Sequence, residues 1–265
     1  TFARSSSSRR PLPSRTSPRP VASRSSTGCA RVPETVARAV RSLEHIARWR
    51  RVRALKNPVS RLAGAVTVEI VEALPEDLSA PLDRPALRPD ADGALRLRYR
   101  WGPDGWTPPV VFVRLRNRSA GLLYCALLNL TERFRIHADL FPGDCLSAGF
   151  FGAALCGAPV ELRLPEGRAV EPGARVRDWL MLLVAEDEFS ARPFELPRLD
   201  GPGDRDGDEV GGRGEVQRTP VALRGLLERL GHAAVHRGVD PVVAVTACDW
   251  TTTLLPIVTE VPLSK

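Results

Sequence analysis

The segment around Cys145 contains residue types that nucleophilic catalysis uses. Residues 143–149 place a thiol beside the carboxylate of Asp144 and the hydroxyl of Ser147, between two glycines. A thiolate nucleophile needs a base, usually an imidazole, within hydrogen-bond reach. Phe141-Pro142 directly precedes the segment and predicts a turn between strands. Cys145 is therefore a candidate nucleophile, but we favour a structural role for this segment. The chain has four histidines, which are His45, His137, His232 and His236.

Two patterns late in the chain could in principle bind a metal. His232 and His236 are four residues apart on a predicted helix, a spacing that can ligate one ion. No glutamate lies between them and no third ligand is near, so helix-end histidines are the favoured interpretation. Asp204, Asp206 and Asp208 alternate as in a calcium loop, but the sixth position is glutamate where such a loop needs glycine. We therefore expect neither a metal nor a cofactor.

The positive charge of the chain lies in its first residues. The formal net charge is +7, and the seven arginines before Glu34 are accompanied by no acidic residue, so the remainder is nearly neutral. Residues 1–32 are rich in Ser, Arg and Pro and predict a disordered tail. The chain begins at Thr1 and its only methionine is Met181, which indicates a fragment or a processed chain.

A connecting amphipathic helix is predicted within residues 33–57. Pro33 suits the first turn, and Asn57-Pro58 ends the helix, which should span about 34–55. Apolar residues at i, i+4, i+7 and i+11 form one narrow stripe, and the opposite face is basic. We expect that basic face to be solvated rather than to bind phosphate. The stripe consists of Val36, Val40, Leu43 and Ala47, and the basic face of Arg48, Arg50, Arg51 and Arg53.

After the helix the apolar period changes to two, which is typical of half-buried strands. Short runs separated by Gly, Pro and Asp predict an antiparallel β-sandwich over residues 61–265. The turn at 117–121 should let Val113 and Leu127 face each other across a core. The predicted strands are 65–71, 95–101, 111–117, 122–130, 134–140, 159–164 and 178–185.

The end of the chain predicts three additions to this mainly β module. Residues 200–215 are rich in Gly and Asp and predict a flexible loop. Leucines at helical spacing predict a late helix over 220–236. Strand-like runs at 242–250 and 254–261 predict a C-terminal hairpin on a sheet edge, limited by Pro256 and Pro262.

Several strings together resemble the C-terminal accessory region of actinobacterial caspase-like cysteine proteases. Residues 43–49 and 55–58 look like the helix and linker that follow the protease domain, and residues 113–119 and 122–130 like the central strands. The strings at 140–143, 178–184, 249–250 and 258–262 follow in the expected order. The resemblance implies that the protease domain and its His/Cys dyad lie outside this chain, since no histidine here has the His-Gly setting of that family.

The leading hypothesis is therefore a non-catalytic accessory module that docks onto a caspase-like protease domain or recruits its substrate. One alternative is a diverged cysteine peptidase that uses Cys145 with His137 or His232. Another is nucleic-acid binding through the Arg-rich tail and the first helix, although basic and aromatic residues are not interleaved. Five irregularly spaced cysteines without a CxxC pair suggest free thiols in the cytoplasm. The chain contains no run of 18 apolar residues, so no membrane-spanning helix is predicted.

Overall fold

The computed structural model describes residues 31–199 and 249–263. The chain divides into two compact units, residues 1–40 and 41–265, which are considered separately. Helix α1, Arg31–Arg53, begins in the first unit and ends in the second. It confirms the helix predicted from the sequence, and its last turn carries Arg50, Arg51 and Arg53, which favour the negative end of the helix dipole. No helix in the described ranges is long and apolar enough to cross a membrane.

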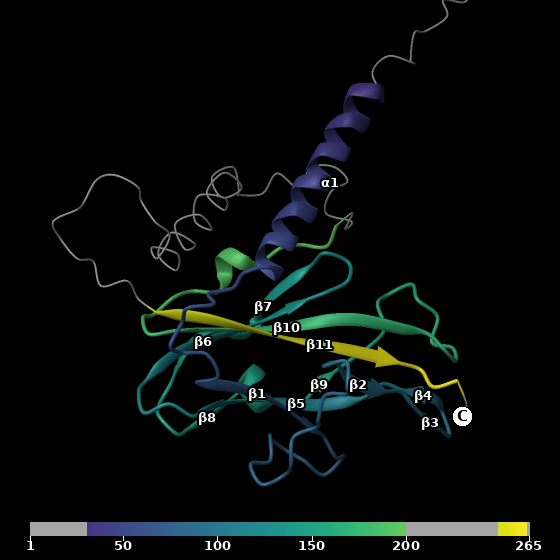
Figure 1. Ribbon diagram of the computed structural model, residues 1–265. Helices are drawn as coiled ribbons and strands as arrows, with labels where there is room; N and C mark the ends of the chain where they lie inside the picture. The colour runs from purple at the N-terminus through teal and green to yellow at the C-terminus, as the bar shows by residue number, and fades with distance from the viewer. Residues whose placement is uncertain (1–30, 200–248, 264–265) are drawn as a thin grey trace, which may run out of the picture. The chain divides into compact units, whose positions relative to one another are not determined.

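The second unit is mainly β, as predicted, and contains two larger sheets (Figure 1). In the first sheet the long strand β5 is central, with β1 on one side and both β8 and β9 on the other. All of its pairs are antiparallel. Its strands are β1 (Val66–Glu72), β5 (Val110–Asn117), β8 (Phe151–Ala153) and β9 (Val160–Glu161).

The second sheet has five strands in the order β2-β11-β10-β6-β7. Its pairs are antiparallel except for β2 with β11, which is parallel, so the prediction of a purely antiparallel fold is wrong at this pair. The two strands come from segments about 160 residues apart, and local sequence patterns do not reveal such a pairing. The strands are β2 (Leu95–Arg98), β11 (Trp250–Glu260), β10 (Arg175–Ala185), β6 (Leu123–Leu130) and β7 (Ile136–Leu146).

Four short elements complete the described part of the chain. Strands β3 (Arg100–Gly102) and β4 (Gly105–Thr107) form a separate two-stranded hairpin. Its Trp101 and Trp106 rings meet edge to face, with their centroids 5.1 Å apart. Two 3-10 turns, η1 (Ala154–Gly157) and η2 (Arg192–Phe194), follow β8 and β10 respectively.

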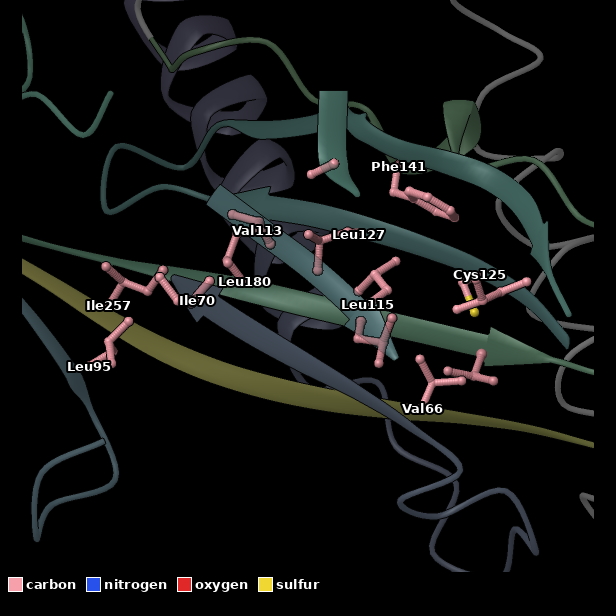
Figure 2. Packing of buried hydrophobic residues seen from close by; sticks show 14 of the residues in the cluster. Val66, Ile70, Leu95, Val113, Leu115, Cys125, Leu127, Phe141, Leu180 and Ile257 are labelled. Atoms are coloured by element: carbon pink, nitrogen blue, oxygen red, sulfur yellow. The ribbon is translucent and has the colours of Figure 1, made fainter. Parts of the chain in front are cut away.

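The main core lies between the two sheets and is almost entirely aliphatic (Figure 2). Every second residue of β5 and β6 points into it, because side chains alternate between the faces of a strand. Val113 and Leu127 both belong to this core, which confirms that the turn at 117–121 brings their strands face to face. Asn117 fixes that turn, since its Nδ2 donates to the carbonyl oxygens of Gly121 and Leu146, each at 2.8 Å.

A second core covers the other face of the five-stranded sheet. Leu128 and Leu183 point into it from β6 and β10, and residues of α1 and of the segment around η2 cover them. β6 and β10 are thus buried on both faces, which explains why their sequences are continuous apolar runs rather than alternating ones.

The structure corrects two predictions about turns. Phe141-Pro142 is not a turn, because β7 continues through it with an irregularity opposite Cys125 and Ala126. The C-terminal hairpin is also absent from the described residues, since 250–260 form the single strand β11. β11 is not an edge strand along its whole length either. It pairs with β2 from Ile257 onward, so Pro256 lies where no strand is paired on that side and its missing N–H costs little.

Two predicted strands differ in extent from the observed ones, and several predicted elements lie outside the described residues. Strand 95–101 is divided at Tyr99 into β2 and β3, and strand 159–164 shrinks to the two residues of β9. The loop predicted at 200–215, the helix at 220–236 and the run at 242–248 lie outside the described residues. So do residues 1–30 of the tail predicted at 1–32, whereas its last two residues already belong to α1.

Candidate functional site

Cys145 lies on β7 opposite Tyr124 and is exposed. His137 is on the same strand, eight residues earlier, opposite Asn129. At about 3.3 Å per residue, an extended strand separates these two residues by roughly 25 Å. The structure therefore does not bring His137 to the Cys145 thiol, and the other histidine considered for this role, His232, lies outside the described residues.

Gly143, two residues before Cys145, has a packing role. Gly143 has a φ of 120°, and a Cβ at this position would overlap the carbonyl oxygen of Phe189. Next to it, the carbonyl oxygen of Pro142 accepts a hydrogen bond of 3.1 Å from the Ala191 amide. Residues 143–146, which were considered as a nucleophile loop, thus belong to strand β7, and the chain around residue 190 packs against them.

The remaining candidates for chemistry are also dispersed. Cys125 is fully buried, and desolvation raises the pKa of its thiol to about 12, so it stays protonated. Burial and Arg135 lower the pKa of His137. Residues 31–199 and 249–263 contain no cluster of three or more His, Cys, Asp or Glu side chains that could bind a metal. Both late patterns lie beyond these ranges, namely His232 and His236, and Asp204, Asp206 and Asp208.

Aromatic rings fix the C-terminal part of α1 to the five-stranded sheet. Trp49 is 3% exposed and meets Phe134 and Trp179 edge to face, with centroid separations of 5.4 Å and 5.6 Å. The Arg53 guanidinium lies over the Trp179 ring, 4.1 Å from its centroid, where the ring's electron density attracts a cation. Val52 completes the packed face. We call this contact, made by residues 45–57, the helix joint.

Hydrogen bonds to backbone carbonyls orient the helix joint. His45 Nε2 lies 2.8 Å from the Phe134 oxygen, and Arg48 Nη2 donates to the Pro193 oxygen at 3.0 Å. Asn57 Nδ2 donates to the Trp250 oxygen at 2.8 Å. The prediction of a solvated basic face is thus wrong for Arg48, which is partly buried and bonds to the chain around η2. Arg50, Arg51 and Arg53 are exposed, although Arg53 also stacks on Trp179.

The turn that presents Phe134 to the helix is itself tied to β10. Phe134 has a φ of 59°, a strained value for a non-glycine residue that must be held by its surroundings. The Glu132 amide donates to Asp178 Oδ1 at 3.0 Å, and the Glu132 carboxylate pairs with Arg168 at 2.6 Å. Desolvation raises the pKa of Asp178 to about 6, against the opposing effect of the Glu132 amide.

The part of the apolar stripe predicted on α1 that lies in the second unit points away from the sheet. Leu43 and Val52 are nine residues apart, which at about 100° per residue places them on opposite sides of the helix. Val52 is buried, whereas Leu43 is 66% exposed and Ala47 is also exposed. In the first unit, Val36 and Val40 are exposed as well. The residues that pack are instead Trp49 and Val52, with a partly buried His45.

A groove of about 920 Å³ lies where β2, the β3–β4 hairpin and the start of the 73–93 loop meet. Its walls are mainly apolar or proline side chains, including Pro75, Pro108 and Pro109. Trp101, which is 48% exposed, also lines the groove. Leu97 and Phe112, both buried, also contribute to the lining.

The comparisons with known proteins add no identity to this geometry. No protein-family model matches the chain, and no curated protein matches it. The resemblance to caspase-like proteases therefore remains a prediction from the short strings quoted above. Sequence reasoning missed the helix joint and the groove. The pair Trp49 and Val52, three residues apart on one helix face, was the one local signal for the joint.

Proposed function

We propose that this chain is a β-sandwich accessory module without catalysis of its own, which docks onto a caspase-like protease domain or recruits its substrate. The observation that carries the proposal is the orientation of α1. The helix joint fixes one side of the helix to the sheet, so that Leu43 and Ala47 are presented on the other side. A rigidly held apolar stripe is suited to packing against another folded domain, because little conformational entropy is lost on binding.

The positions of the reactive groups support a role in binding. The Cys145 thiol lies on an edge strand far from His137, and Cys125 is buried with a high pKa. Among the described residues, the apolar groove and the exposed helix stripe are features that suit protein partners. The late helix predicted at 220–236, which lies outside the described residues, belongs to the same proposal.

A peptide-cleavage assay tests the absence of catalysis. The full chain is incubated with fluorogenic peptides that end in Arg or Asp, alongside the Cys145→Ala variant. We expect both proteins to give the same background rate. Turnover by the unaltered chain that disappears in Cys145→Ala would overturn the proposal in favour of a cysteine peptidase.

A binding assay tests the docking partner. A purified actinobacterial caspase-like protease domain is titrated with the full chain by calorimetry. Leu43→Ser should weaken binding, because it removes apolar surface from the stripe. Arg41→Ser is the matched control, since Arg41 is also exposed but lies about 160° away around the helix. Absence of binding, or equal effects of the two variants, would count against docking through α1.

A further inference from the structure

The outer edge of β2 borders the groove, and its backbone groups have no strand partner in residues 31–199 and 249–263. Within the described part of the chain, β2 is the last strand of its sheet and pairs only with β11. The Tyr99 amide donates to the Glu260 carbonyl oxygen at 2.9 Å. The backbone N–H and C=O groups of the odd-numbered residues of this segment therefore point toward β11. Because this direction alternates along a strand, the N–H and C=O groups of Arg96 and Arg98 point outward.

The lining of the groove suits the side chains of an extended segment. Pro75, Pro108 and Pro109 provide apolar walls that lack N–H donors, so these residues cannot donate backbone hydrogen bonds to a ligand. Trp101 adds a large, partly exposed ring to the lining. The groove therefore offers main-chain hydrogen bonds at β2 and apolar contact elsewhere.

The charges at the rim are balanced, which decides the class of ligand. Three arginines and three carboxylates line the groove. Arg98 pairs with Glu260 at 2.9 Å, Arg96 pairs with Asp90 at 2.6 Å, and Arg100 pairs with Glu72. A phosphorylated peptide or a nucleic acid would need unpaired positive charge. A neutral peptide with apolar side chains requires no such excess.

We propose that the groove binds an extended peptide of a partner protein, which adds a strand to the outer edge of β2 and places every second side chain, apolar in character, against the groove wall. Strand addition of this kind obtains affinity from main-chain hydrogen bonds and selectivity from alternate side chains. The inference rests on the proposed function in that the chain is a protein-binding module, but it concerns a surface separate from the helix stripe.

Fluorescence anisotropy with defined peptides tests this inference. The probe is a labelled octapeptide in which Val or Leu alternates with Ser, and the comparison is an isomer with the same residues in two blocks. The full chain should bind the alternating peptide with a Kd below about 1 mM and the block isomer more weakly. N-methylation of alternate peptide nitrogens should weaken binding about three- to tenfold for each backbone hydrogen bond lost.

A matched pair of variants at one residue locates the site. Arg98→Pro removes the outward N–H of β2, whereas Arg98→Ala removes the ion pair with Glu260 and keeps that N–H. Arg98→Pro should lose about three- to tenfold in affinity relative to Arg98→Ala. Circular dichroism checks that both variants fold, and the N-methylated peptide gives the same test without any substitution.

Three results would overturn the inference. Equal binding of the N-methylated and unmodified peptides would mean that no strand is added. No peptide binding, while docking that depends on Leu43 persists, would remove the groove site and leave the proposed function intact. Dimerisation in the ultracentrifuge that Arg98→Pro abolishes would assign the β2 edge to a second copy of this chain. Conversely, peptide binding without docking to a protease domain would keep the groove and remove the proposed function.

Discussion

The two faces of the five-stranded sheet pack against different kinds of side chain. Leu127 and Leu128 are neighbours on β6, both fully buried, and they point into opposite cores. Leu127 meets an aliphatic core shared with the other sheet, whereas Leu128 lies beneath a layer that contains Trp49 and Phe194. Aliphatic packing alone is non-directional, but edge-to-face rings and hydrogen bonds to carbonyls set an orientation. The inner core thus holds the fold together, and the outer core orients α1.

The largest effect is expected where the inner core is opened. Leu127→Ala should lower the free energy of unfolding by about 3–4 kcal/mol, because two hydrogen-bonded sheets cannot collapse into the cavity. Leu128→Ala should cost about 2–3 kcal/mol, because the helical layer can move inward and fill part of the space. Chemical denaturation measures both values. A greater loss for Leu128→Ala would reverse this ranking of the two cores.

Removal of the Trp49 ring from the helix joint should allow the helix to detach while the two sheets stay folded. Trp49→Ala is expected to cost about 2–3 kcal/mol, at the low end for a buried aromatic residue, because the helix can detach without unfolding the sheets. Hydrogen exchange should then show lost protection over residues 45–53 and retained protection in β6 and β10. The exposed Leu43→Ala is the control and should change neither. Loss of protection throughout the sheets would mean that the two layers unfold as one.

The sequence predicted the inner layer better than the outer one, and the two leucines show why. Alternating runs such as 111–117 identify strands with one buried face, and the turn at 117–121 follows from its polar residues. The run at 122–130 is apolar on both faces, which indicates a strand covered on two sides. The sequence near this strand does not indicate which elements cover its second face.

Long-range pairing explains the other failures. The stripe at Leu43 is the more regular apolar pattern on α1, yet within the second unit Trp49 is buried against the five-stranded sheet and Leu43 is exposed. Pro142 predicted a turn, but β7 tolerates it next to a strand irregularity. The groove depends on the parallel pairing of β2 with β11, which is set by tertiary structure and not by residue spacing.

A pH titration tests whether the charge on Asp178, in strand β10, lowers the stability of the fold. Asp178 has an ordinary pKa of 3.8 in the unfolded chain and about 6 in the folded one. The folded state therefore binds more protons between these values, and stability should fall as the pH rises from about 4 to about 6. We expect a loss of about 1–2 kcal/mol, less than the full shift implies, because Asp178 is only partly buried and water can reach its carboxylate.

Asp178→Asn should abolish this loss, since the amide oxygen can still accept the Glu132 hydrogen bond. At pH 7 the variant should therefore be more stable than the unaltered chain by about the same 1–2 kcal/mol. Thermal unfolding at pH 4 and pH 7 measures the difference, with the exposed Asp83→Asn as the control. A variant that is less stable at pH 7 would show that the Asp178 carboxylate is stabilising there.

The smallest effect concerns the cation at the helix joint. Arg53→Ala should cost about 0.5–1 kcal/mol, the usual contribution of a cation over an aromatic face at an exposed site. Arg51→Ala is the matched control, because Arg51 is exposed in the same turn and makes no ring contact. Arg53→Lys should recover part of the loss, since lysine keeps the charge but not the planar stacking. If both alanine variants have equal unfolding free energies, the joint depends on its rings and carbonyl bonds alone, and the outer layer differs from the inner one through Trp49, Phe134 and Trp179 rather than through charge.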